Sequence, residues 1–104
     1  MQLSIREKKR FRTIGHQLNP VVTIAGRGLE DGVLAELERA LSDHELIKIK
    51  LTAPDRQSRQ QLMDAIKDRT GAISIQVVGN KALIYRAASK PKPHLSNILR
   101  SNIF

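Results

Sequence analysis

The chain has 104 residues, a net charge of +8 and no cysteine. This length suffices for one domain with its own hydrophobic core, and the lack of cysteine excludes a disulfide framework, a thiolate nucleophile and a cysteine-based zinc site. No apolar run approaches the length of a signal sequence or a membrane span, so we expect a soluble, cytoplasmic protein with no membrane partner.

The positive charge is concentrated at the two ends of the chain. Residues 1–27 contain six Lys or Arg and one acid, residues 69–104 contain six Lys or Arg and no acid, and the middle is net negative. If the two ends meet in the folded protein, they form one basic face that suits a polymer of phosphates. The alternative is that the excess charge serves only solubility.

The first 24 residues predict a helix and a short strand. Ser4 and Glu7 form a capping-box pattern. Three apolar residues then recur at helical spacing: Phe11, Ile14 and Leu18. We therefore expect a helix over residues 5–17. Asn19-Pro20 prevents it from continuing, and a β-branched strand is expected over 21–24.

The rest of the chain predicts two more helices, three more strands and a tail. The helices are expected over residues 30–43 and 55–70, the strands over 46–51, 73–78 and 81–86, and the tail over 87–104. Gly71 suits a left-handed helix cap, and Gly79-Asn80 suits a two-residue hairpin turn. The strand over 46–51 alternates, so we expect Ile47, Ile49 and Leu51 to face a core and Lys48 and Lys50 to face a partly wet side.

These elements predict a single compact α/β domain in the order α-β-α-β-α-β-β. Its four-stranded sheet is mixed, because strands separated by helices are expected to be parallel neighbours and the final hairpin must be antiparallel. We divide the chain into a domain, residues 1–86, and a basic, Pro-containing C-terminal tail, residues 87–104. The tail is expected to lie outside the core.

A glycine-rich turn between the first strand and the second helix is the best candidate binding site. It consists of Ala25, Gly26, Arg27 and Gly28. Glycine lets the backbone approach a ligand, and the helix that follows directs its N–H groups and positive dipole end toward an anion. The turn is neither a Walker loop nor a GxGxxG fingerprint. It is therefore either a clamp on a nucleic-acid backbone or a purely structural corner.

Catalytic patterns are missing from the sequence. His16, His44 and His94 are far apart and form no ligand-spaced pair, and the serines lack a nucleophile-elbow context. We predict that the protein is not an enzyme and uses no metal or cofactor. Aromatic residues are scarce, so base stacking is expected to contribute little to binding.

Four segments resemble the CRM domain, specifically its stand-alone bacterial form, the YhbY-like proteins. They are Leu3-Ser4, Pro20-Val21-Val22, Gly28-Leu29 and the His44-Glu45-Leu46-Ile47-Lys48-Ile49-Lys50 stretch. The resemblance runs from Leu3 to about Arg86. It implies a fold similar to the C-terminal domain of a bacterial translation initiation factor. It also implies RNA binding, since bacterial family members associate with large-subunit precursors and plant relatives act in chloroplast intron splicing. The family's Gly-x-x-Gly loop falls on residues 25–28, with alanine at its first position.

The sequence therefore predicts a non-enzymatic protein that binds ribosomal RNA of large-subunit precursors during ribosome assembly, with ribosomal proteins as further partners. The expected RNA-binding residues are helix cations, the turn and two strand lysines: Lys8, Lys9, Arg12, Ala25, Gly26, Arg27, Gly28, Lys48 and Lys50. The alternative is an adaptor that reaches the ribosome through ribosomal proteins. It would dock through the apolar residues of the tail, Leu95, Ile98, Leu99 and Ile103.

Overall fold

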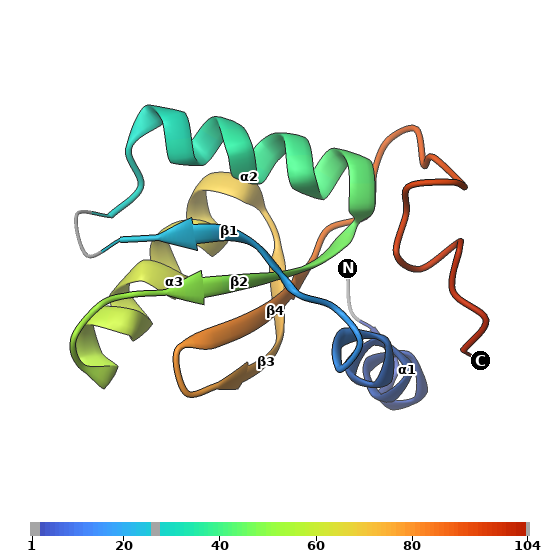
Figure 1. Ribbon diagram of the computed structural model, residues 1–104, viewed down its shortest axis with the longest axis horizontal. Helices are drawn as coiled ribbons and strands as arrows, with labels where there is room; N and C mark the ends of the chain where they lie inside the picture. Colours follow the sequence, from blue (N-terminus) through green and yellow to red (C-terminus); the bar gives the residue numbers. More distant parts are fainter. Residues whose placement is uncertain (1–2, 26–27, 104) are drawn as a thin grey trace.

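The computed structural model describes residues 3–25 and 28–103 of the chain. The elements are α1 (Ile5–Gly15), β1 (Pro20–Ile24), α2 (Asp31–His44), β2 (Leu46–Leu51), α3 (Arg56–Thr70), β3 (Ile73–Val78) and β4 (Lys81–Tyr85) (Figure 1). Every predicted helix and strand is present, with bounds within two residues of those expected. The predicted element order and the α/β fold class are confirmed.

The helix ends follow the local signals in the sequence. The Ser4 hydroxyl accepts a hydrogen bond from the Glu7 N–H at 3.0 Å, and the Glu7 carboxylate accepts one from the Ser4 N–H at 3.2 Å. Gly71 ends α3 with a left-handed φ of 74°. These contacts satisfy backbone groups that a helix end leaves without partners, which explains why short-range patterns located the helices well.

The four strands form one mixed sheet in the order β1-β2-β4-β3. β1 and β2 are parallel, and β4 is antiparallel to both β2 and β3. The expectation of parallel neighbours is correct for β1 and β2 and wrong for β2 and β3, because β4 lies between them. Burial explains this order: four of the five β4 residues are buried and need a strand on each side, whereas β3 is half-exposed and suits an edge.

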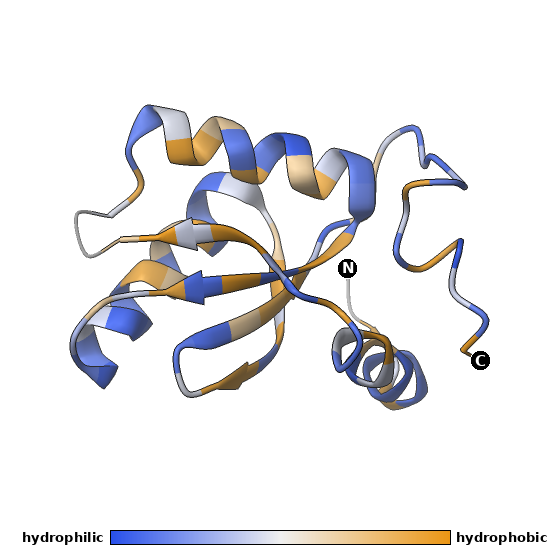
Figure 2. Cartoon of the chain, in the orientation of Figure 1, coloured by the Kyte–Doolittle hydropathy of each residue, from blue (hydrophilic) through white to orange (hydrophobic). Residues whose placement is uncertain are grey.

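Helices cover the two faces of the sheet unequally. α2 and α3 pack on one face, over a core cluster that includes Ile47, Ile49 and Leu51 of β2. α1 packs on the other face, over a smaller cluster that includes Phe11 and Leu46. In Figure 2, α2 alternates between hydrophobic and hydrophilic colours along its length, as an amphipathic helix does. The predicted core side of β2 is confirmed.

A glycine allows α1 to lie close to the sheet. A Cβ atom at Gly15 would be 2.5 Å from Leu83 Cδ2, closer than van der Waals contact permits. α1 has only 11 residues, and it packs on residues of β2, β3 and β4 such as Leu46, Ile73 and Tyr85. The helix therefore leaves part of this sheet face uncovered. Among the described residues, none of the helices combines the length and the apolar character that crossing a membrane would require.

The C-terminal segment is held on the domain by buried polar contacts. The Ser96 hydroxyl donates a hydrogen bond to Glu45 Oε1 at 2.8 Å, and the Ala88 N–H donates one to Glu45 Oε2 at 2.8 Å. The Asn97 amide donates to the Leu46 carbonyl at 2.7 Å. Ser96 and Asn97 are buried, with exposed fractions of 0% and 7%. These contacts satisfy a buried carboxylate and a buried carbonyl that would otherwise destabilise the fold.

The same segment also contacts α1. The Arg10 guanidinium donates hydrogen bonds to the carbonyls of Ile103 at 2.7 Å and Ile98 at 3.1 Å, and both isoleucines pack against the cluster under α1. The expectation that this segment lies outside the core is therefore wrong. Leu95, Ile98 and Leu99 lie in turns, and Ile103 lies in irregular structure. The division of the chain at residue 86 stays a prediction. α1 and the C-terminal segment meet at one end of the molecule, so the two basic ends of the chain lie side by side (Figure 1).

Candidate nucleic-acid interface

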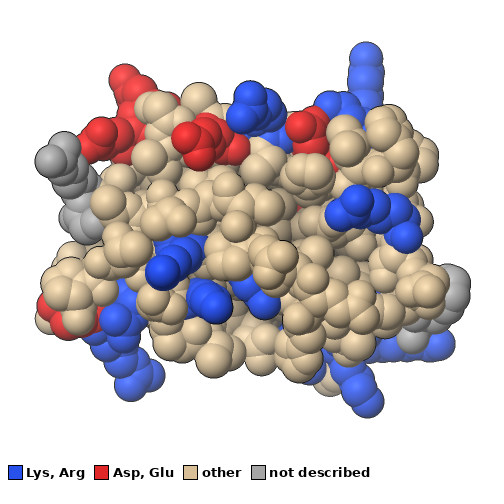
Figure 3. All heavy atoms as spheres, viewed as in Figure 1, with Lys and Arg blue, Asp and Glu red and all other residues tan. Residues whose placement is uncertain are grey.

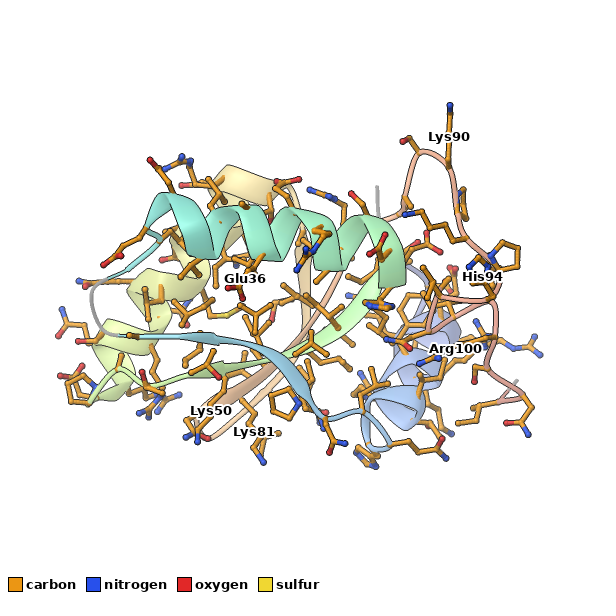
Figure 4. All side chains as sticks on the ribbon, turned by 45° about the horizontal axis from the view of Figure 1, so that its top comes forward. Glu36, Lys50, Lys81, Lys90, His94 and Arg100 are labelled. Atoms are coloured by element: carbon orange, nitrogen blue, oxygen red, sulfur yellow. The ribbon has the colours of Figure 1, made fainter. Side chains whose placement is uncertain are left out.

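The uncovered part of the α1 side of the sheet carries three lysines. Lys48 and Lys50 alternate with core residues of β2, and Lys81 is paired with Lys50 across the β2–β4 ladder. On β3, Gln76 and Val78 pair with Leu83 and Lys81 and face the same side. Figure 4 shows Lys50 and Lys81 pointing out of the sheet together. We call this surface, formed by Lys48, Lys50, Gln76, Val78 and Lys81, the open sheet face.

A groove of about 230 Å³ lies between the open sheet face and the end of α1. Its lining residues are His16, Lys48, Gln76, Val78, Lys81, Ala82 and Leu83. Ala82 and Leu83 are buried and give it an apolar floor, and the lysines and His16 give it a basic rim. Within the part of the chain that the structure describes, no acidic side chain lines it. An apolar floor with cations around it suits a ligand that carries negative charge beside apolar surface.

α1 extends this basic surface along one of its sides. Lys8, Arg12 and His16 recur at intervals of four residues, so they lie in one row along the helix. Because His16 lines the groove, the row leads into the open sheet face. Lys9 lies elsewhere, since it lines a separate hollow with Arg10 on the side of α1 that faces the C-terminal segment. Of the three predicted α1 cations, two therefore join the lysines of the sheet and one does not.

The structure describes the first and the last residue of the glycine turn, Ala25 and Gly28. The Ala25 carbonyl accepts a hydrogen bond from the Gly28 N–H at 3.1 Å, and Gly28 has a φ of 92°, which favours glycine. Among the described residues, only Glu45 combines a side chain with a positive φ. Ala25 thus occupies the family's first glycine position without backbone strain. Gly26 and Arg27 lie outside the described residues.

The turn follows the carboxyl end of β1 and precedes α2. The Thr52 N–H donates to the Ile24 carbonyl at 2.9 Å and ties the ends of β1 and β2 together. Glu30 is the N-cap residue of α2 but makes no capping hydrogen bond with its side chain, and Asp31 lies in the first turn. These carboxylates repel a phosphate at the start of α2, whereas the three lysines on the sheet attract one.

The predicted site residues form a path rather than one pocket. Figure 1 places α1 near one end of the long axis, and the end of β1 near the other. The open sheet face lies between them, because Thr23 pairs with Lys50 and the turn begins two residues after Thr23. In Figure 3, Lys and Arg side chains occupy the middle of the visible face over the sheet, and Asp and Glu gather mostly along the edge over α2.

Several other cations stabilise the fold. The Arg86 guanidinium lies 2.7 Å from Glu38 Oε2 and donates to the Thr70 carbonyl at 3.0 Å. Lys92 pairs with Asp43, and this hydrogen-bonded ammonium lowers the pKa of the Asp43 carboxyl. Among the described residues, no ion pair involves a lysine of the open sheet face. These lysines are therefore available to bind an external anion.

The two aromatic rings that the structure describes are not available to stack on a base. The rings of Phe11 and Tyr85 pack together under α1 with centroids 4.8 Å apart, and both are buried. Burial, together with the charge of Glu45, raises the pKa of Tyr85. Within residues 3–25 and 28–103, no group of His, Asp and Glu side chains is arranged to hold a metal ion. The surface therefore suits phosphate contacts better than base stacking or metal chemistry.

The family model of the CRS1/YhbY (CRM) domain matches residues 3–86. The chain belongs to this family. A CRM relative from Pseudomonas aeruginosa, "Probable RNA-binding protein PA4753", is 49% identical over 100 residues that make up 96% of each chain. An "RNA-binding protein" from Haemophilus influenzae is 42% identical over 93 residues, or 89% of this chain and 94% of that protein. The solution structure of SAV1595 from Staphylococcus aureus has the same fold, with a TM-score of 0.73, 22% identity, and 86% and 93% of the two chains covered.

In this CRM domain, the His44-Glu45-Leu46-Ile47-Lys48-Ile49-Lys50 stretch that carries part of the resemblance has a structural role as well. Glu45 ends α2 with a φ of 61°, and its buried carboxylate holds the C-terminal segment through Ser96 and Ala88. Lys48 and Lys50 of the same segment belong to the open sheet face. The segment thus joins the anchor of the C-terminal residues to the basic surface.

Sequence reasoning missed His16 and Lys81. A signal for His16 existed, because it continues the four-residue spacing of Lys8 and Arg12. Lys81 joins the surface only because β4 pairs with β2, and no local pattern fixes that pairing.

Proposed function

We propose that this protein binds RNA along the open sheet face and the adjoining side of α1. One observation carries the proposal: five cations follow one another from the helix across the sheet, and the described lining of the groove between them has no acidic side chain. They are Lys8, Arg12, Lys48, Lys50 and Lys81. Cations in a row bind successive phosphates and release counterions, which gives affinity with little dependence on sequence. The names of the two bacterial relatives support RNA as the ligand.

Recognition rests on the RNA backbone and its shape. The Phe11 and Tyr85 rings pack on each other inside the protein, so they do not offer a stacking platform. The turn that begins at Ala25 follows the strand residue that pairs with Lys50 by two positions, and its Arg27 lies outside the described residues. Lys9 lies off the main path and contributes to the local potential rather than to a phosphate contact.

We further propose that the RNA is ribosomal RNA in precursors of the large subunit, bound in the cytoplasm during ribosome assembly without catalysis, with ribosomal proteins as neighbours. The resemblance to the YhbY-like proteins supports this assignment. The adaptor alternative has less support, because Ile98 and Ile103 of its docking segment pack on the domain itself.

Sequencing of RNA crosslinked to the protein in cells tests this proposal. We expect the reads to concentrate in large-subunit ribosomal RNA and to fall strongly in a variant with Lys48, Lys50 and Lys81 changed to Gln. A spread of reads over unrelated transcripts would contradict the ribosomal assignment. Equal recovery with the triple variant would contradict the open sheet face as the binding surface.

A further inference from the structure

A second basic pocket lies on the other side of the β3–β4 hairpin, between the hairpin and α3. Its volume is about 300 Å³. It is lined by Arg56, Arg59, Gln60, Met63, Val77 and Gly79. Met63 is buried and forms an apolar floor, whereas Arg56 and Gln60 are exposed and lie at the rim.

The pocket and the open sheet face are separated by one strand. β3 is one of the two edge strands of the sheet that the described residues form. Val77 lines the pocket and Val78 lines the groove beside the open sheet face. These neighbouring valines are 48% and 64% exposed. The two exposed valines thus lie between the cations of the pocket and those of the open sheet face.

We propose that this pocket holds one unstacked nucleotide of an RNA strand that crosses the edge of the β3–β4 hairpin from the open sheet face. The inference rests on the proposed function, since it extends the same RNA path. A single strand can bend around the edge strand and place a base on the far side. A stiff duplex cannot, so the pocket distinguishes unpaired from paired RNA.

The lining residues match the chemistry of a nucleotide. Met63 and Val77 offer apolar contact to a base. Gln60 offers its carbonyl oxygen and the amide N–H that it does not donate to Asp64. A planar guanidinium stacks on a base or binds a phosphate, and the pocket has two of them. The Arg59 guanidinium donates to the Ala53 carbonyl at 3.4 Å, which holds it near the start of α3.

Two carboxylates lie beside residues of this pocket, and one oxygen of each accepts a hydrogen bond. Asp64 Oδ1 accepts one from the Gln60 amide at 3.0 Å. Asp55 caps α3 by accepting a hydrogen bond from the Ser58 N–H at 2.7 Å. That contact lowers the pKa of Asp55, which is charged at neutral pH. Both charged residues of the described pocket lining are arginines, so the lining itself is positive and suits a phosphate.

Binding to two RNAs tests this inference. The probes are a fluorescently labelled single-stranded oligonucleotide and the same strand annealed to its complement. The variant is Arg56→Gln with Arg59→Gln, and its matched control is Arg39→Gln with Arg69→Gln, which removes the same charge from exposed helix positions outside the pocket lining. We expect the pocket variant to bind the single strand at least about tenfold more weakly than the control does, and to bind the duplex as the control does.

The outcomes separate this inference from the proposed function. If the pocket variant and its control bind the single strand equally while the Lys48, Lys50 and Lys81 variant binds it weakly, the pocket assignment is wrong and the proposed function stands. If the wild-type protein binds neither RNA, the proposed function fails. Arg56→Gln alone keeps the Arg59 contact with Ala53, so a loss of affinity in this single variant excludes misfolding as the cause.

Discussion

The salt dependence of RNA binding gives the sharpest prediction about the open sheet face. We consider the change of Lys48, Lys50 and Lys81 to Gln, which removes three charges and keeps most of each aliphatic stem. Five cations on the path predict a log–log slope of roughly −3.5 on single-stranded RNA, so raising the salt from about 50 to 200 mM should weaken wild-type binding roughly 100-fold. With two cations left, the slope becomes roughly −1.4 and the same change in salt costs only about sevenfold.

Fluorescence anisotropy at a series of salt concentrations measures this slope. The control changes Arg39, Lys67 and Arg69 to Gln, since these side chains lie on the helices that cover the opposite face of the sheet. Both variants have the same net charge, so a general effect of charge would change both slopes equally. Equal slopes in the two variants would refute the assignment of the phosphate contacts to the open sheet face.

Three further predictions concern the scaffold that positions this face. Ser96→Ala removes a donor from the buried Glu45 carboxylate and should lower the free energy of unfolding by about 1–3 kcal/mol in urea titrations; no change would show that the contact is not needed. Gly15→Ala places a Cβ against Leu83 and should cost about 1–3 kcal/mol in the same assay, and a neutral result would mean that α1 shifts freely. Burial raises the pKa of Tyr85, so its neutral form stabilises the fold below the unfolded pKa of about 10, and stability should fall as the pH rises above that value; Tyr85→Phe should lack this fall.

The helices and strands were predictable because their signals are local. The Ser4 and Glu7 capping box, the Gly71 cap and the alternation along β2 each depend on residues a few positions apart. The partly wet face of the sheet followed from the same alternation, since Lys48 and Lys50 had to lie opposite the core. Local patterns are therefore enough to assign most of the predicted RNA-binding cations to a helix or a strand.

Long-range pairing was not predictable in this way. The position of Lys81 depends on β4 entering the sheet beside β2, and the position of the C-terminal segment depends on hydrogen bonds from Ser96 and Asn97 across some 51 residues of sequence. Ser96 and Asn97 act as single polar residues, and single residues do not recur at the spacing of a helix or a strand. The sequence therefore gives no pattern that reveals their contacts. A segment rich in Lys and Pro therefore resembled a free tail, although its contacts hold it against α1 and α2.

A titration of isotopically labelled protein with single-stranded RNA, followed by NMR, tests the central claim most directly. We predict that the largest amide shifts occur at His16, Lys48, Lys50 and Lys81, with small shifts along the exposed side of α2 around Glu36 and Arg39. Shifts centred on that side of α2, with the residues of the open sheet face unchanged, would contradict the proposed path of the RNA.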